Sequence, residues 1–179
     1  MCGSSYLGKN APHIDVFPRY YLPNTTYQSA VIGLLQRVTQ AEVVVDGERL
    51  AAIGKGLMVL VGVERGDAEP QAARLADRLL GYRVFPDAEG RMNLSLGDIE
   101  GGLLLVPQFT LPADTDKGMR PSLSRAAPPD EGEHLFSTLV SYARSKHARV
   151  ECGRFGAHMR VTLTNDGPVT FTLRVAPDG

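Results

Sequence analysis

From residue 31 onward, the chain alternates short runs of β-branched and aliphatic residues with turn signals. Asp46-Gly47 separates the first two runs, and an Asp-Gly pair between such runs is typical of a β-hairpin. Gly54-Lys55-Gly56 marks the next break. The run Leu103–Val106 is short and continuously apolar, which indicates a buried strand. Strands therefore supply most of the predicted secondary structure.

Two segments have the apolar spacing of helices. Residues 68–83 place apolar side chains on one face, with Asp67 as the expected N-cap and Pro70 in the first turn. Residues 130–147 present a wider apolar face, with acidic residues at the start and Lys146 near the end, as the helix dipole favours. These helices do not alternate regularly with the strands, so the pattern predicts a mixed α+β domain.

The two ends of the chain differ in pattern. Residues 1–30 are rich in Pro, Asn, Ser and Tyr and lack a sustained period, so we expect a disordered or loosely attached extension. Residues 31–179 form the predicted domain. Near its end, the runs 158–164 and 169–175 predict two strands, joined by a turn at Asn165-Asp166-Gly167-Pro168.

Composition narrows the class of protein. The chain has 43% hydrophobic and 22% charged residues, which is typical of a soluble globular protein. It lacks both a run of the roughly 20 apolar residues that a membrane helix needs and a recognisable secretory signal, so we expect a cytoplasmic protein. The net charge of −1 argues against non-specific coating of nucleic acid, but not against an enzyme that grips one end of an RNA. The spacing of the histidines and cysteines predicts no metal site, and we expect no cofactor.

Two loops carry the candidate chemistry. Pro107–Pro112 follows the buried strand and holds Gln108, Phe109 and Thr110 between two prolines. Binding sites are often built on loops at the ends of rigid strands, yet a core Phe109 and a solvated Gln108 are the simpler local interpretation. The second loop, 165–170, has the composition of an ordinary turn. Neither loop predicts a function when it is considered alone.

Together with the rest of the sequence, these loops resemble the D-aminoacyl-tRNA deacylase family, once named D-tyrosyl-tRNA deacylases. The resemblance runs from about Ile32 to Val175. The matching segments are GLLQRV (Gly33–Val38), VDGE (Val45–Glu48), IGKGLMVLVGVE (Ile53–Glu64), GYRVFPDAEGRMNLSL (Gly81–Leu96), QFTL (Gln108–Leu111), KGMRPS (Lys117–Ser122), GRF (Gly153–Phe155) and NDGPVTF (Asn165–Phe171). So many ordered matches form a strong signal. The resemblance implies a mixed, mostly antiparallel sheet that forms a partial barrel with two main helices.

The resemblance also implies which residues form the site. The first family signature is Ser-Gln-Phe-Thr, and here Pro107 replaces the Ser and removes one backbone N–H. The side chain of Gln108 and the N–H groups of Phe109 and Thr110 remain as candidate catalytic groups. The second signature, Asn-x-Gly-Pro-Val-Thr, is present without change. It implies a cis Gly167-Pro168 pair whose carbonyls reach the active site of a partner subunit.

The implied activity is hydrolysis of the ester in D-aminoacyl-tRNA, and in mischarged glycyl-tRNA, by a homodimer with composite active sites. The resemblance further implies that Gly167 and Pro168 act as a chirality filter that clashes with an L side chain, and that Arg37 holds this filter in place. It also implies that the 2′-OH of the tRNA assists the attack by water, and we expect Thr110 to position the substrate.

A polar loop follows the first signature. Its residues Lys117, Arg120 and Arg125 are candidate contacts to phosphates of the acceptor end, and a solvated loop is an equally good interpretation.

Two other functions stay open. One is a related deacylase that removes a misattached L-amino acid, which the intact Gly167-Pro168 and Phe109 disfavour and the replacement at Pro107 leaves open. The other is a non-catalytic RNA-binding module on the same fold, which the near-neutral charge disfavours. The preferred amino acid and tRNA do not follow from the sequence.

Overall fold

The computed structural model of the chain describes residues 28–116 and 118–177. Within them the elements are β1 (Val31–Val45), β2 (Glu48–Ile53), β3 (Gly56–Gly62), α1 (Glu69–Gly81), β4 (Phe85–Pro86), β5 (Met92–Leu94), β6 (Gly102–Pro107), α2 (Pro129–Lys146), β7 (Val150–Cys152) and β8 (Met159–Val175). The predicted α+β class is confirmed. No helix in the described ranges is long and apolar enough to cross a membrane.

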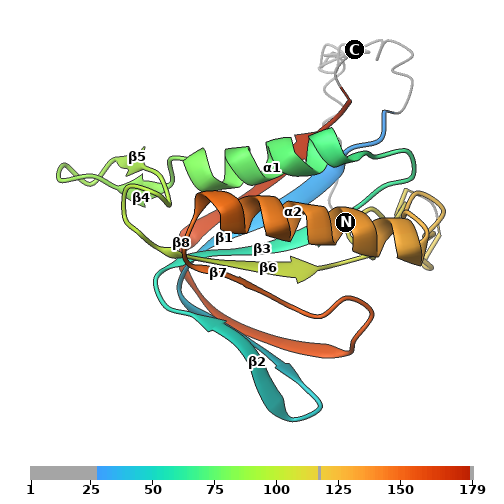
Figure 1. Cartoon of the computed structure of the whole chain (residues 1–179), viewed down its shortest axis with the longest axis horizontal. Coiled ribbons are helices and arrows are strands. Elements are labelled where there is room, and N and C mark those ends of the chain that lie inside the picture. The colour runs from blue at the N-terminus through green and yellow to red at the C-terminus, as the bar shows by residue number, and fades with distance from the viewer. Residues whose placement is uncertain (1–27, 117, 178–179) are drawn as a thin grey trace, which may run out of the picture.

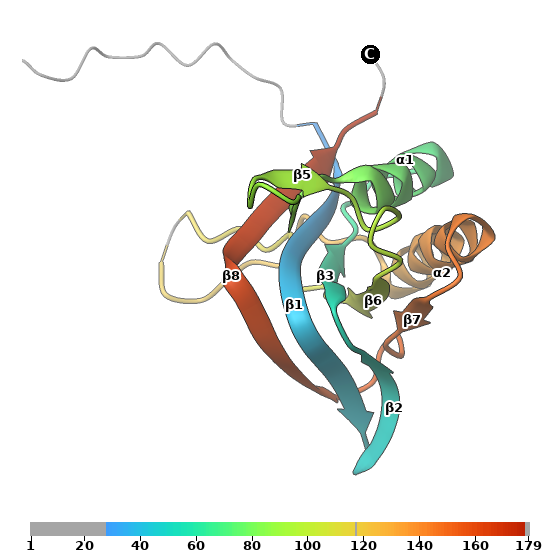
Figure 2. The same cartoon turned by 90° about the vertical axis from the view of Figure 1, so that its left-hand side faces the viewer.

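A single curled sheet organises the domain (Figure 1). β2, β1, β3, β6 and β7 are neighbours in that order, and β8 pairs with the other edge of β1. The pairs that involve β1 are antiparallel, while β3, β6 and β7 run parallel to one another. Figure 2 shows the sheet curling from β8 through β1 and β3 to β7. The mixed, mostly antiparallel partial barrel is therefore as predicted.

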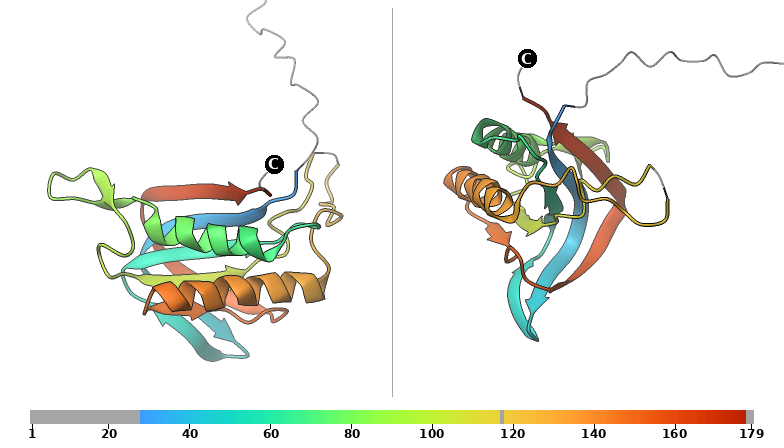
Figure 3. Two further views of the ribbon diagram at one scale, coloured as in Figure 1. Left: turned by 45° about the horizontal axis from the view of Figure 1, so that its top comes forward. Right: turned by 90° about the vertical axis from the view of Figure 1, so that its right-hand side faces the viewer.

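The two helices lie side by side on one face of the sheet, as both views of Figure 3 show. Leu103 and Leu105 of β6 belong to the core cluster between helices and sheet, whereas Leu104 and Val106 belong to a second cluster inside the curl. Because β6 is buried on both faces, its sequence is continuously apolar instead of alternating. The buried strand predicted over Leu103–Val106 is confirmed.

The start of α1 differs from the prediction. Asp67 is not the N-cap: the cap is Ala68, whose N–H donates to the side-chain oxygen of Gln71 at 3.0 Å. The Asp67 carboxylate accepts instead from the N–H of Glu64, at 2.8 Å, and so closes the turn before the helix. Pro70 lies in the first turn as expected. A carboxylate can satisfy an N–H on either side, and local spacing did not distinguish the two.

The predicted turn between two C-terminal strands is also wrong. Residues 159–175 form one strand, β8, and both halves pair with β1. Gln36 pairs with Thr170 and Val38 with Asn165, so residues 166–169 stand opposite Arg37 alone. The Asn-Asp-Gly-Pro segment is therefore a bulge within an antiparallel pair and not a hairpin, although both use the same residue types.

Buried Glu64 ties the start of β1 to the body of the domain. Ala30 is 2% exposed, and its N–H donates to Glu64 Oε2 at 2.8 Å. Arg174 of β8 donates to the same oxygen at 3.1 Å. Residues 28–30 thus belong partly to the fold, while residues 1–27 of the predicted extension lie outside the described residues.

We predict that removing residues 1–27 changes neither thermal stability nor activity. Removing residues 1–30 should leave a folded, active protein that is less stable by about 1–2 kcal/mol, because Glu64 loses a donor to its buried carboxylate. Urea unfolding of the full chain and both truncated chains measures the difference. An insoluble or inactive protein after either deletion would contradict the domain boundary.

The turn at Asp67 gives a pH dependence. Burial raises the pKa of Asp67 to about 6, and nearby Glu64 adds to the rise, although the Glu64 N–H, Ser29 and Arg174 favour the charged form. The folded protein therefore binds this proton more tightly than the unfolded chain, so the contribution is present at low pH and is lost as pH rises through about 6.

Between pH 4 and pH 7, we predict that the wild type loses about 1 kcal/mol of stability that Asp67→Asn does not lose, since the side chain is partly exposed and screened. Chemical unfolding of both proteins at a series of pH values measures this. Parallel stability curves for the two proteins would show that Asp67 does not titrate in this range.

Candidate active site

β6 ends in a tight turn whose backbone is held from one side. The N–H of Gln108 donates to the carbonyl of Val61 at 2.7 Å, and the N–H of Leu111 donates to the carbonyl of Gln108 at 3.1 Å. Within the described residues, the N–H groups of Phe109 and Thr110 have no hydrogen-bond partner. Two adjacent backbone donors are therefore available at the end of a rigid, buried strand.

The side chains of this turn are accessible. Phe109 is 62% exposed, so it is not a core residue. The side-chain amide of Gln108 donates to Thr110 Oγ1 at 2.5 Å, which leaves the Thr110 O–H free to donate elsewhere. The three predicted catalytic residues thus lie together on one turn, as their adjacency in sequence requires.

A pocket of about 390 Å³ opens beside this turn. Its walls come from the ends of β3 and β6, the loop before α2, the first turns of α2 and the connection from β7 to β8. The lining residues are Val61, Val63, Arg65, Pro107, Gln108, Phe109, Leu123, Ala126, Ala127, Pro128, Pro129, Gly132, Phe136, Phe155, Gly156, Ala157 and Met159. The lining is largely apolar and includes few polar side chains, which is typical of a ligand site.

The sequence did not assign several of these walls to a site. Phe155 belongs to the GRF match, and Phe136 belongs to the apolar face of the second predicted helix, but neither position indicates a binding site in the sequence. Both line the pocket. The signal available for Phe155 is the nearby pair of glycines, Gly153 and Gly156, since glycines favour sharp changes of chain direction.

The loop before α2 is fixed to the end of β3. The N–H of Arg65 donates to the carbonyl of Arg125 at 2.9 Å, and the N–H of Ala127 donates to the carbonyl of Val63 at 3.0 Å. Arg125 forms ion pairs with Asp114 at 2.9 Å and Asp116 at 3.7 Å. The guanidinium of Arg125 therefore braces the loop that forms one wall of the pocket.

Of the other two predicted RNA contacts, the structure describes only Arg120. Arg120 is exposed on the same loop. Lys117 lies outside the described residues. No group of three or more potential metal-ligating side chains occurs among residues 28–116 and 118–177.

Gly167 and Pro168 lie on the β8 bulge, away from this pocket. The bond between them is cis, as the resemblance implies, and both residues are exposed. The Asn165 side chain holds the base of the bulge: its Nδ2 donates to the carbonyls of Arg37 and Val169, each at 3.1 Å. Neither Gly167 nor Pro168 is among the residues that line the pocket of the same chain.

The Arg37 side chain holds the bulge through hydrogen bonds. Its Nε donates to the carbonyl of Asp166 at 2.8 Å and also pairs with the Asp166 carboxylate at 3.1 Å. Its Nη1 donates to the carbonyl of Val84 at 2.6 Å. The Arg37 side chain is only 13% exposed, so it is not an ordinary surface ion pair. It joins the bulge to the segment that leads into β4.

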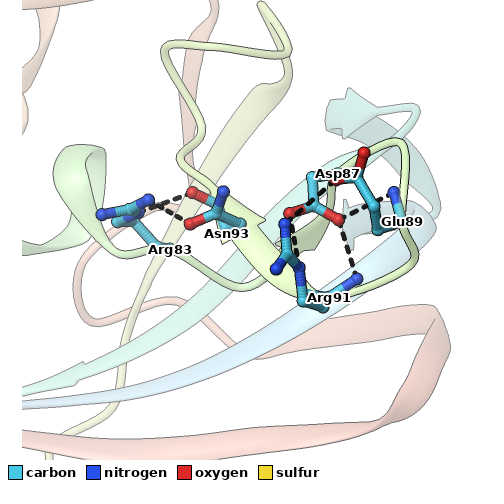
Figure 4. A network of polar contacts seen from close by, with 5 residues as sticks. All are labelled: Arg83, Asp87, Glu89, Arg91 and Asn93. Atoms are coloured by element: carbon cyan, nitrogen blue, oxygen red, sulfur yellow. Dashed lines mark hydrogen bonds and ion pairs between the residues drawn. The ribbon is translucent and has the colours of Figure 1, made fainter.

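The β4–β5 hairpin beside Arg37 is rigid. Asp87 accepts from the backbone N–H groups of Glu89 and Arg91 at 3.0 and 2.9 Å, and Arg83 donates to Asn93 (Figure 4). The backbone hydrogen bond from Arg91 is the largest influence that holds the pKa of Asp87 below its usual value. The carbonyl that receives Arg37 is thus presented by a well-braced segment.

Comparison with known proteins decides the family. A sequence model described as D-Tyr-tRNA(Tyr) deacylase matches residues 34–174. The chain belongs to this family. It is 63% identical over 147 residues to a D-aminoacyl-tRNA deacylase of Nitrosococcus oceani, which covers 82% of this chain and 95% of that protein.

Solved structures with a similar fold support the same assignment. A structure named c-Myc DNA Unwinding Element Binding Protein matches with a TM-score of 0.77 and 35% identity, covering 82% of this chain and 99% of that one. A structure described as a probable eukaryotic D-amino acid tRNA deacylase matches with a TM-score of 0.71, covering 82% of this chain and 100% of that one. At 20% identity the second likeness shows the fold. The family and fold that the resemblance implied are confirmed.

The contacts of Arg37 give a prediction. We expect Arg37→Lys to lower the free energy of unfolding by about 1–3 kcal/mol, because lysine has a single nitrogen in place of the separate Nε and Nη1 that donate to the carbonyls of Asp166 and Val84. Asp166→Asn keeps the backbone carbonyl that Arg37 contacts and should cost less. Urea unfolding of the two variants compares them, and an equal or larger loss for Asp166→Asn would show that the carboxylate, not the carbonyls, is the main partner.

Proposed function

We propose that the protein is a cytoplasmic enzyme that hydrolyses the ester of D-aminoacyl-tRNA, and of mischarged glycyl-tRNA, to release the free amino acid and tRNA. The observation that carries the proposal is the turn after β6. The N–H groups of Phe109 and Thr110 are unpartnered within the described residues, and Gln108 and Phe109 of this turn line an apolar pocket, in a chain that belongs to a deacylase family.

The pocket suits the last nucleoside of the tRNA. Its largely apolar walls, which include Phe155 and Phe136, can enclose a flat base. A base in this position directs its ribose and the attached ester toward the turn. The ester carbonyl then lies near the N–H groups of Phe109 and Thr110.

The reaction is an addition followed by an elimination. Water adds to the ester carbonyl, and the two N–H groups stabilise the negative charge that develops on its oxygen. The bond from carbon to the ribose oxygen then breaks, that oxygen takes a proton, and the amino acid leaves as a carboxylic acid. The neighbouring 2′-OH of the tRNA assists the proton transfer. The protein contributes mainly orientation and backbone donors.

The chirality filter comes from a second copy. Gly167 and Pro168 are exposed, and they line no part of the pocket in their own chain. A homodimer that places this bulge over the partner's turn gives a composite site. The two carbonyls would then clash with an L side chain, while a D side chain points away and glycine has nothing to exclude. Arg37 supports the filter through Asp166.

The RNA contacts are divided among three basic residues. Arg120 is exposed and can reach a phosphate of the acceptor end, and we assign Lys117 the same role. Arg125 already pairs with Asp114 and Asp116, so its main contribution is to hold the loop that forms one wall of the pocket.

One assay separates this function from the alternatives. The purified protein is incubated with D-tyrosyl-, L-tyrosyl- and glycyl-tRNA, and the release of each amino acid is followed. We expect rapid release of D-tyrosine and glycine and retention of the L-tyrosyl ester. Release of L-tyrosine at a similar rate would point to a deacylase of misattached L-amino acids, and binding without release to an RNA-binding module.

Thr110 tests the mechanism. If the Thr110 hydroxyl only positions substrate, Thr110→Ala should retain measurable activity, within about 30-fold of the wild type, as is typical for loss of one hydrogen bond of about 2 kcal/mol. A tRNA that ends in 2′-deoxyadenosine should be hydrolysed far more slowly by the wild type. Complete loss of activity in Thr110→Ala, together with normal cleavage of the 2′-deoxy substrate, would instead indicate a covalent threonine intermediate.

A further inference from the structure

The backbone N–H position of residue 107 points toward β7, while the Pro107 ring lines the pocket. Backbone N–H groups of β6 point alternately to its two neighbours: Gln108 donates to Val61 on the β3 side, and Leu103 donates to Arg149 on the β7 side, at 2.8 Å. Residue 107 is four positions after Leu103, an even number, so a backbone N–H there would point to the same side of β6. A backbone N–H at position 107 would therefore point toward β7, so Pro107 removes a donor to β7 and leaves the N–H groups of Phe109 and Thr110 in place.

Pro107 meets Gly153 at the point where the two strands separate. The last ladder hydrogen bond that these strands share runs from the N–H of Gly153 to the carbonyl of Leu105, at 2.8 Å. The next would need an N–H at position 107, which proline lacks, so the pairing ends there. A Cβ on Gly153 would lie 3.2 Å from Pro107 Cδ and 2.7 Å from Met159 Sδ. The proline ring thus occupies the space that a glycine leaves open.

Beyond this contact, the chain leaves the sheet and forms a wall of the pocket. Gly156 has a φ of +72°, a conformation that favours glycine, and it turns the chain back toward β8. Between the two glycines, Phe155 packs against α2, where a Cβ on Gly132 would lie 3.2 Å from its ring. Phe155, Gly156 and Ala157 all line the pocket.

We infer that Pro107 and Gly153 act as a pair of positioning residues that end the β6–β7 ladder and fix the loop bearing Phe155, and so set the shape of the pocket for the terminal nucleoside. The identity of that ligand rests on the proposed function. The pair acts on the pocket wall and leaves the Phe109 and Thr110 donors in place. It therefore governs substrate binding and has little effect on the chemical step.

The test adds a Cβ at position 153, next to the Pro107 ring. Gly153→Ala should raise KM for D-tyrosyl-tRNA at least tenfold, with kcat within threefold of the wild type. Because the proline ring is rigid and Met159 is flexible, Pro107→Ala in the same chain should relieve most of this loss and return KM to within threefold of Pro107→Ala alone. Gly54→Ala is the matched control, since a Cβ there meets nothing within 4 Å, and it should behave as the wild type.

A second readout does not depend on catalysis. Calorimetry measures the affinity for 3′-D-tyrosylamino-3′-deoxyadenosine, an amide that cannot be hydrolysed by the ester reaction, and Kd should follow KM across the variants. Circular dichroism checks the fold of each protein. If Gly153→Ala does not fold, Phe155→Leu, which removes the ring from the same wall, should raise Kd at least fivefold while kcat is retained.

The outcomes are distinct. Three results for a folded Gly153→Ala protein would overturn the inference: unchanged KM and Kd, a fall confined to kcat, or a loss of binding that Pro107→Ala does not relieve. An unchanged Kd in Phe155→Leu would also overturn it. A wild-type protein that binds the amide but cleaves none of the charged tRNAs would overturn the proposed function, and the Kd values would still decide whether the pair sets the pocket.

Discussion

The pairing of β1 with three other strands is the constraint on which both the turn after β6 and the β8 bulge depend. One edge of β1 carries β3 and then β2, and the other carries β8 along its length. Through β3, this strand fixes the position of β6 and hence the turn at Gln108–Leu111. Through β8, it fixes the bulge at residues 166–169. A single strand therefore sets the separation between the backbone donors and the Gly-Pro pair, and it keeps them on different parts of one chain.

Much of this arrangement could be predicted because the local patterns were strong. The Asp46-Gly47 hairpin, the two helices and the doubly buried β6 each follow from residue type and spacing, and each is found. The bulge could not be predicted in the same way. Asn, Asp, Gly and Pro favour any chain reversal or irregularity, and only the second half of β8, by pairing with β1, distinguishes a bulge from a hairpin.

The site could be predicted in part, for a related reason. Gln108, Phe109 and Thr110 are adjacent in sequence, so a strand end brings them together whatever the rest of the fold does. The pocket wall is different, because Phe155 and Gly132 meet only through tertiary packing between the β7–β8 connection and α2. Arg125 shows the opposite case. Its charge suggested a phosphate contact, whereas Asp114 and Asp116 from the same loop already surround it.

The proposed site is built on backbone donors, and such a site follows different rules of substitution from one built on side chains. Replacing the Phe109 or Thr110 side chain cannot remove its N–H, so the donors persist as long as the turn keeps its shape. What matters then is the backbone geometry, which Gln108 maintains by its bond to Val61. A proline is therefore compatible with position 107. A backbone N–H at this position would point toward β7, and the proline ring packs at the end of the strand. In the proposed mechanism the aminoacyl ester is already activated, so orientation and the two backbone donors take the place of an acid–base pair.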